Sequence, residues 1–479
     1  MSSRSHSHDR RPAHKGWTLV IASLGVFMTA LDTLVVTTAL PVLRTSLHSG
    51  LAGLEWTVNA YNLSFACLLL TGAALGDRFG RRRMFAVGLA SFAGASAAAA
   101  LSPTVAALVV ARAAQGAGAA LVMPLSLTLI SEAFPVEKRG AAVGLWGGIA
   151  GLAVAAGPVV GGAVVSGLSW HWIFWVNVPV GAALAPLALR RLSESFGPQC
   201  RLDVPGVVLA GAGALGLTWG LVRADAAGWA SAEVLGALVA GAVLVGAFLC
   251  WERRAAHPML PLSLFRSRGF AAANGVSFFM YAGLFGALFL MSQLLQSGLG
   301  YSPLQAGLRL LPWTLPPMFV APLAGTLADR YGNRPFMVLG LALQAVGYAW
   351  VAQIVAPGVG YGQLGLAFGV AGVGTSFCFP TVANAILASV PLERAGVASG
   401  ANSTLRELGG VLGVAVLASV FASHGTYASP RGFVDGFSPA VWAAVALSAV
   451  GIAAALLTAG RRAHAAARVT PLEPALAVD

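Results

Sequence analysis

Long uninterrupted runs of apolar residues, separated by short clusters of charged and turn-forming residues, make up most of the chain. A transmembrane helix needs about 20 predominantly apolar residues, and the runs meet that length. None of them has the alternating pattern, about ten residues long, that is typical of strands in a membrane β-barrel. The pattern therefore predicts an all-α polytopic membrane protein with fourteen transmembrane helices. We place these spans at residues 17–43, 56–76, 84–101, 104–131, 141–166, 172–189, 205–223, 232–251, 270–296, 303–327, 335–354, 361–388, 397–421 and 438–460.

The composition excludes other classes of protein. Hydrophobic residues make up 57% of the 479 residues and charged residues only 10%, whereas a typical soluble domain has about 25% charged residues. Neither a soluble nor a disordered chain fits these values. The two lysines, Lys15 and Lys138, do not follow glycines, so the chain lacks the Gly-Lys-Ser/Thr loop of a P-loop ATPase.

Cationic residues are distributed unevenly between the two sides of the membrane. With the N-terminus inside, the inner loops and tails hold 23 Lys and Arg residues, and the outer loops hold three. Since cytoplasmic loops carry an excess of Lys and Arg, we expect both termini in the cytoplasm. The bias toward Arg and Ala fits a GC-rich bacterial genome, and we expect the protein in a bacterial inner membrane. The formal net charge of +12 is then a topology signal, and we expect no nucleic acid partner.

An internal repeat divides the chain into two halves. The sequence DRFGRR at 77–82 recurs as DRYGNR at 329–334, an offset of 252 residues, each time between two apolar spans. Such repeats are common in secondary transporters. We therefore predict two six-helix bundles plus two extra helices. The expected regions are a cytoplasmic tail at 1–16, an N-terminal bundle at 17–190, a linker with the extra helices at 191–269, a C-terminal bundle at 270–460 and a cytoplasmic tail at 461–479.

Asp32 is an ionisable residue inside the first span, where a charge is costly and by default suggests function. At a rise of 1.5 Å per residue, Asp32 lies about 14 Å below the outer end of the first helix. Arg112 lies about 12 Å below the outer end of the fourth helix. The two opposite charges thus share one depth. A static ion pair that fixes packing is one interpretation. The other is a proton-coupling pair, because desolvation raises and a nearby arginine lowers the pKa of a carboxyl group.

Further polar residues lie inside other spans. Glu407 and Arg406 lie about 15 Å into the thirteenth span and, as neighbours in a helix, need not pair with each other. Glu407 is a second candidate proton site, or else an ion-pair partner of another helix. Gln115 is three residues from Arg112 and shares its face of the helix. We expect a substrate cavity lined by Gln115, Asn62, Asn274, Gln293, Asn384 and Arg406.

Two segments suggest conformational roles. The repeated loops contain Gly80 and Gly332, which permit a tight turn with positive φ, and we expect their charges to form a latch present in only one conformation. This gating loop comprises Asp77, Arg78, Gly80, Arg81 and Arg82, with Asp329 and Arg330 in the second copy. The fifth span contains Gly157, Pro158, Gly161 and Gly162, where proline kinks a helix and glycine allows close helix contact.

These motifs together resemble the major facilitator superfamily, and within it the fourteen-helix drug:proton antiporter family. The segments that carry the resemblance are LDTLVVTTALP (31–41), GDRFGRRR (76–83), RAAQGAGAA (112–120), GPVVGG (157–162), WHWIFWVNVPVG (170–181) and RAGVASGANSTLRELGGVLG (394–413). The resemblance implies a major facilitator fold. It implies that Asp32 and Arg112 serve proton coupling, that residues 77–82 form a gating loop, and that Gly157 and Pro158 belong to a motif associated with exporters.

The sequence thus predicts a proton-coupled efflux antiporter that exports amphipathic organic compounds, such as drugs, antibiotics or secondary metabolites, by alternating access. We expect a monomer in the lipid bilayer, with a small-molecule substrate and protons as partners, no cofactor, no metal and no enzymatic activity. The alternatives are an uptake symporter of the same fold, which the fifth-span motif disfavours, and a membrane-embedded enzyme or a sensor. An enzyme would need a catalytic constellation at one interface, and a sensor would normally carry an added soluble domain.

Overall fold

The computed structural model describes residues 15–197, 203–256, 258, 260–391 and 394–458. In these residues the regular elements are helices, and fourteen helical stretches are long and apolar enough to cross a membrane. Each of the fourteen predicted spans coincides with one of these stretches. The chain is therefore the all-α polytopic membrane protein that its hydrophobic pattern predicts.

The N-terminal half has one interrupted span, because a break at Val176, three residues before Pro179, divides the sixth span into two helices. Its helices are α1 (Lys15–Ser46), α2 (Leu51–Phe79), α3 (Arg81–Ala100), α4 (Val105–Ala133), α5 (Val136–Gly167), α6 (Trp172–Trp175) and α7 (Asn177–Arg191). The extra pair follows as α8 (Val204–Ala227) and α9 (Ala232–Glu252), and the short helix η1 (Leu262–Arg266) leads into the C-terminal half.

The C-terminal half also has an interrupted span. Pro312 and Pro316 lie near breaks that divide the predicted span 303–327 into three helices, since proline cannot donate the backbone hydrogen bond that a continuous helix needs. The helices of this half are α10 (Arg268–Gln293), η2 (Leu294–Gly298), α11 (Pro303–Arg309), α12 (Leu311–Thr314), α13 (Pro316–Tyr331), α14 (Asn333–Ile354), α15 (Tyr361–Ala388), α16 (Ala395–His424) and α17 (Pro430–Leu456).

The last span shows the largest difference from prediction. It begins at Pro430 and not at 438, because the Ser429 hydroxyl accepts a hydrogen bond of 3.0 Å from the Gly432 amide and caps the helix. Proline is favoured at the first position of a helix, where its missing N–H has no partner to lose. The second proline, Pro439, is accommodated inside the helix.

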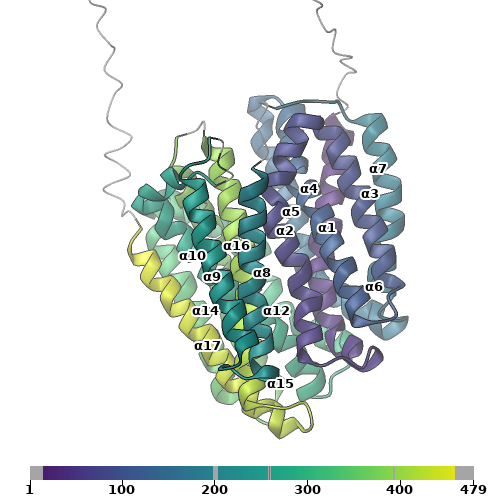
Figure 1. Cartoon of the computed structure of the whole chain (residues 1–479), viewed down its shortest axis with the longest axis vertical. Coiled ribbons are helices and arrows are strands. Elements are labelled where there is room, and N and C mark those ends of the chain that lie inside the picture. Colours follow the sequence, from purple (N-terminus) through teal and green to yellow (C-terminus); the bar gives the residue numbers. More distant parts are fainter. Residues whose placement is uncertain (1–14, 198–202, 257, 259, 392–393, 459–479) are drawn as a thin grey trace, which may run out of the picture.

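Helix packing produces two bundles with the extra pair at their seam. In the first half α4 packs on α2 and α3, α5 on α1, and α7 on α3; in the second, α10 packs on α16 and α17, and α14 on α15 and α17. Helix α8 packs on α9 and also on α2 and α16, one helix from each bundle. Figure 1 shows the purple and blue first half beside the green and yellow second half, with α8 and α9 across the seam.

The repeated turns lie at one end of the molecule, which we call the inner end; the opposite one is the outer end. Gly80 and Gly332 have φ values of 105° and 91°, the positive φ that their place in the repeat predicts. Figure 1 places the start of α1 and the end of α17 at the same end of the bundle, as an even number of spans requires.

The two halves share their largest buried core toward the outer end, and a smaller cluster of Leu63, Cys67, Ala214 and Val411 also joins α2 to α16. One cluster of buried apolar side chains contains residues of both halves, such as Leu40 of α1, Leu290 of α10 and Phe421 of α16. Toward the inner end the clusters separate into one around Phe85 and Phe92 and another around Phe270 and Met337. The structure is thus a conformation closed at the outer end.

Candidate transport site

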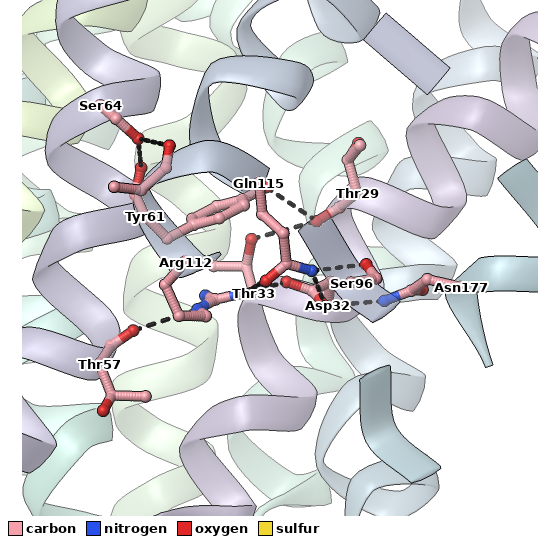
Figure 2. A network of polar contacts seen from close by, with 11 residues as sticks. Thr29, Asp32, Thr33, Thr57, Tyr61, Ser64, Ser96, Arg112, Gln115 and Asn177 are labelled. Carbon is pink, nitrogen blue, oxygen red and sulfur yellow. Dashed lines mark hydrogen bonds and ion pairs between the residues drawn. The ribbon is translucent and has the colours of Figure 1, made fainter. Parts of the chain in front are cut away.

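The carboxylate of Asp32 is buried at the centre of a network of polar side chains. The Asp32 side chain is 0% exposed, and that of Arg112 is 1% exposed. The carboxylate forms an ion pair with the Arg112 guanidinium, and it accepts hydrogen bonds from the amides of Asn177 (2.8 Å) and Gln115 (3.2 Å). Helices α1, α4 and α7 each supply one part of this arrangement, which Figure 2 shows.

Arg112 is held from several sides. Its Nε donates to the carbonyl oxygen of Thr57 on α2 at 3.1 Å, and its Nη1 also donates to Gln115 at 3.0 Å. The ring of Tyr61 lies against the guanidinium, with 4.3 Å between the guanidinium carbon and the ring centroid. Because a buried charge must be paired and hydrogen-bonded to be tolerated, this set of contacts accounts for the burial of the Arg112 guanidinium.

Gln115 and Ser96 complete the network on the side of α3. The Gln115 amide donates to the Ser96 hydroxyl at 2.7 Å, and both side chains are 0% exposed. Protonation of Asp32 would remove the ion pair and leave Arg112 with neutral partners only. Such a change would alter an ion pair that lies among several helices, which is one way in which a proton can bias a conformational equilibrium.

A cavity of about 150 Å³ lies between the two halves. Its walls are mostly apolar and aromatic, and its two charged residues are Arg406 and Glu407. The aromatic side chains that line it are Tyr61, Phe65, Tyr281, Phe285, Trp313 and Phe379. A concave, largely apolar site with a few polar groups is typical of small-molecule binding, although in this conformation the cavity is smaller than the roughly 300–1,000 Å³ of a drug-sized site.

The charged residues of the cavity pair with each other. The Arg406 Nη2 and a Glu407 carboxylate oxygen lie 3.1 Å apart, although adjacent positions on α16 did not require this. The Arg406 side chain is 25% exposed and that of Glu407 is 9% exposed, so the cation faces the cavity more openly. Arg406 also lies over the ring of Tyr281 at 4.8 Å.

Tyr61 connects the buried network with the cavity. It lines the cavity, its ring contacts Arg112, and its hydroxyl donates to the Thr29 carbonyl oxygen at 3.3 Å. Asp32 itself does not line the cavity. A molecule in the cavity would therefore contact the Asp32–Arg112 pair through Tyr61.

Of the six residues predicted to line a substrate cavity, Arg406 does so in this conformation. Gln115 belongs to the Asp32 network, and Asn62 is buried within α2. Asn274 accepts a hydrogen bond of 3.2 Å from Asn402 and so joins α10 to α16, while Asn384 is half-buried on α15.

Gln293 lies at the outer end instead. Its side-chain oxygen accepts a hydrogen bond from the Tyr427 hydroxyl, and the Arg44 guanidinium lies 3.7 Å from the centroid of that tyrosine ring. Arg44 belongs to α1, and the other two residues belong to the C-terminal half. Gln293 is therefore part of the outer-end contact between the halves.

The predicted gating loop is tied to the N-terminal half. The Arg81 Nη2 lies 2.7 Å from a carboxylate oxygen of Asp77, and Arg81 also forms an ion pair with Glu132 at the end of α4. The Arg82 amide donates to the carboxylate of Glu194 at 2.9 Å. Arg78 lies 5.3 Å from the ring centroid of its neighbour Phe79.

The second copy of the loop has fewer described contacts. Arg330 lies 5.4 Å from the ring centroid of Tyr331. The side chain of Asp329 lies outside the described part of the structure, although its backbone belongs to α13.

The glycines of α5 form a tight contact at the outer end. Gly157 and Gly161 face α1, where a Cβ would overlap Leu34 or Thr38, and a Cβ on Gly162 would overlap the carbonyl oxygen of Pro303 on α11. Reciprocally, Gly307 of α11 lies against the carbonyl oxygen of Pro158. This motif therefore packs the two halves directly against each other.

Sequence reasoning missed several partners of these residues. Asn177, Ser96 and Thr57 contact the central network, and Glu132 and Glu194 contact the gating loop. Asn177 is a polar residue in the mostly apolar motif at 170–181, which is a usable signal. Thr57 contributes a backbone carbonyl, for which the side-chain type gives no signal.

Comparison with known proteins identifies a family and several relatives. The family model described as Major Facilitator Superfamily matches residues 22–413 and 273–478. The tetracenomycin C resistance and export protein of Streptomyces glaucescens is 37% identical over 88% of this chain and 81% of its own length. The cephamycin export protein CmcT of Amycolatopsis lactamdurans is 36% identical, over 96% and 92%.

Solved structures support the fold. A peptide transporter POT in complex with sulfate has a TM-score of 0.68 at 15% identity, over 92% of this chain and 96% of that one. The xylose transporter XylE from E. coli, in a partially occluded inward open conformation, has a TM-score of 0.60 at 15% identity, over 96% and 98%. At such low identity the likeness concerns the arrangement of helices.

Proposed function

Because this chain belongs to the Major Facilitator Superfamily, whose members carry small molecules across membranes, we propose that it is a proton-coupled efflux antiporter. The observation that carries the proposal is the buried Asp32–Arg112 pair, which meets the central cavity through Tyr61. A titratable group in this place can respond to what the cavity contains. We also propose that the protein lies in a bacterial inner membrane with both termini in the cytoplasm.

The proposed substrates are amphipathic organic compounds, such as antibiotics or other secondary metabolites. Relatives over most of this chain are named as export and resistance proteins for tetracenomycin C, cephamycin and methylenomycin A. The aromatic walls of the cavity suit an apolar or planar body, and the Arg406–Glu407 pair offers a charge of either sign. We propose that the protein acts as a monomer and uses the proton gradient as its energy source.

The proposed cycle is alternating access about the central cavity. The conformation closed at the outer end admits substrate from the inner side. Opening of the outer end requires the contact of α5 with α11 and the Arg44–Tyr427–Gln293 contact to separate. A proton from outside then neutralises Asp32 or Glu407, which favours release of substrate outward, and loss of that proton inward returns the carrier.

Efflux assays on whole cells test this proposal. Cells that express the protein should retain less of a fluorescent amphipathic compound than cells without it, and a protonophore should remove the difference. Export that continues at the same rate after the protonophore, in cells where ATP is also depleted, would contradict proton coupling. Net uptake of the compound would instead favour a symporter.

A further inference from the structure

A second, larger cavity lies beside the extra helices. Its volume is about 1160 Å³, above the roughly 300–1,000 Å³ of typical drug-sized sites. Helices α8 and α9 form one wall, and α16 with Phe278 of α10 forms the other; residues between α9 and α10, such as Pro258 and Leu260, also line it. The walls are mostly apolar, with Ala210, Leu217, Val245, Phe248, Phe278 and Leu408 among the lining residues. We call this space the lateral groove.

Helix α16 separates the lateral groove from the central cavity. Thr404, Leu405 and Leu408 line the groove, whereas Arg406 and Glu407 line the central cavity. The two spaces therefore lie against different faces of one helix, and the groove needs an occupant of its own. In a bilayer its apolar walls would not be left to water, because exposed apolar surface is unfavourable there.

The charged residues at the inner end of the groove indicate what kind of molecule could bind there. Arg253 follows α9 and Arg266 ends η1, and both are exposed residues that line the groove. Glu252 also lines it, but this residue is only 3% exposed, and its carboxylate accepts a hydrogen bond of 3.0 Å from the Leu260 amide. The opening therefore presents two guanidinium groups, whereas the Glu252 carboxylate is buried.

The groove spans the depth of one leaflet and passes the midplane along α16. From the inner ends of their helices, Val245 on α9 is seven residues away, Phe278 on α10 is ten, Leu217 on α8 is thirteen and Leu412 on α16 is seventeen. At 1.5 Å per residue these positions lie about 10 to 26 Å above the inner ends. Half of a hydrocarbon core is about 15 Å, so the apolar walls cover the whole depth of the inner leaflet.

We propose that the lateral groove binds one anionic phospholipid of the inner leaflet. Its phosphate lies at Arg253 and Arg266, and its acyl chains lie between α8 and α9 on one side and α10 and α16 on the other. Basic pockets between transmembrane helices on the cytoplasmic side are known to bind anionic lipid headgroups. This inference does not depend on which substrate the central cavity carries or on proton coupling.

Native mass spectrometry of the purified full-length protein tests the lipid site. We use phosphatidylglycerol and phosphatidylcholine with identical acyl chains, and glycerol phosphate as a headgroup without chains. One phosphatidylglycerol should remain bound under conditions that remove phosphatidylcholine, and glycerol phosphate should not bind. The double variant Arg253→Gln/Arg266→Gln should bind phosphatidylglycerol about 30-fold more weakly, the effect of two arginines at an anionic lipid surface.

Two further variants separate the effect of the site from the effect of net charge. Arg254→Gln removes the same charge from an exposed neighbour that does not line the groove, and it should leave binding within about twofold of the original, because this side chain does not face the bound phosphate. Ala210→Phe fills the groove and should reduce binding of the lipid while both arginines remain. Equal retention of the two lipids, an undiminished complex in the double variant, or an equal loss in Arg254→Gln would overturn the proposal. If the double variant does not fold, Ala210→Phe alone decides.

Discussion

The ring of Tyr61 lies 4.3 Å from the guanidinium carbon of Arg112, and the same tyrosine lines the central cavity. Arg112 in turn forms the ion pair with Asp32. A substrate that moves or covers Tyr61 therefore changes the surroundings of the buried ion pair without touching it. This relationship would let the proton site that we propose at Asp32, which does not line the cavity, respond to what the cavity contains.

Tyr61 should accordingly tolerate loss of its hydroxyl better than loss of its ring. Tyr61→Phe keeps the cation–π contact, which contributes about 2 kcal/mol in a desolvated site, and loses the hydrogen bonds of the hydroxyl, such as the one to the Thr29 carbonyl oxygen. We expect transport by Tyr61→Phe within about threefold of the original and transport by Tyr61→Ala reduced at least about tenfold. Initial rates of pH-gradient-driven transport in membrane vesicles measure this. Equal transport rates for the two variants would show that the ring of Tyr61 has no part in coupling.

Removal of one partner of the buried ion pair should destabilise the protein more than removal of both. Arg112→Gln leaves the Asp32 carboxylate without its cation, and breaking a buried pair costs about 3–5 kcal/mol. Asp32→Asn/Arg112→Gln leaves two neutral amides in a network of hydrogen bonds. We expect the melting temperature of the double variant in detergent to lie above that of Arg112→Gln, while both are inactive in coupled transport. A double variant that melts below the single one would contradict this.

Gly162 should be needed for closure at the outer end. A side chain there would overlap the carbonyl oxygen of Pro303, so Gly162→Val should hold α5 away from α11. Gly167 on the same helix has open space around its Cβ position, and Gly167→Val is the matched control.

The readout for closure is a cysteine introduced as Ser292→Cys, in a variant without the native cysteines. Ser292 is 0% exposed, and its hydroxyl donates to the Thr37 carbonyl oxygen across the two halves. A membrane-impermeant thiol reagent added from outside should label this cysteine several times faster with Gly162→Val than with Gly167→Val. Labelling at one rate in both would show that the glycine does not hold the outer end closed.

The gating loop should depend on the pairing of Arg81 with Glu132. Glu132→Gln removes the α4 partner of Arg81, whereas Arg78→Gln changes an arginine whose described contact is the neighbouring Phe79 ring. We expect Glu132→Gln to lower the transport rate several-fold, and Glu132→Asp, which keeps the charge, to retain more of it. Arg78→Gln should leave the rate within about twofold of the original. Transport rates measured at matched protein levels decide. Equal rates for Glu132→Gln and the original protein would show that the pair is not needed.

The sequence predicts the fold far more completely than the site. Apolar runs locate all fourteen spans, because each helix must satisfy its backbone polar groups internally while in lipid. Capping shifts a boundary without changing the run, as Ser429 and Pro430 do for α17. Helical rise also places Asp32 and Arg112 at one depth, where the structure joins them.

The lining of the cavity could not be predicted in the same way. A polar residue inside a span can face the cavity, as Arg406 does, or a neighbouring helix, as Asn274 does, and the rotation of each helix decides which. The apolar and aromatic residues that make up most of the cavity wall, such as Trp313 and Phe379, carry no signal that separates them from the packed core. Their position follows only from how the two halves meet.

Movement of protons in response to substrate is the most direct test of the account. Purified protein in liposomes, with a pH-sensitive dye inside, should show proton movement opposite to the direction of substrate when an exported compound is added. Asp32→Asn should still bind the compound but give no substrate-dependent proton movement, whereas Gly167→Val, which meets open space, should behave like the original protein. Proton movement by Asp32→Asn at the original rate would contradict the central claim that the Asp32–Arg112 pair couples protons to transport.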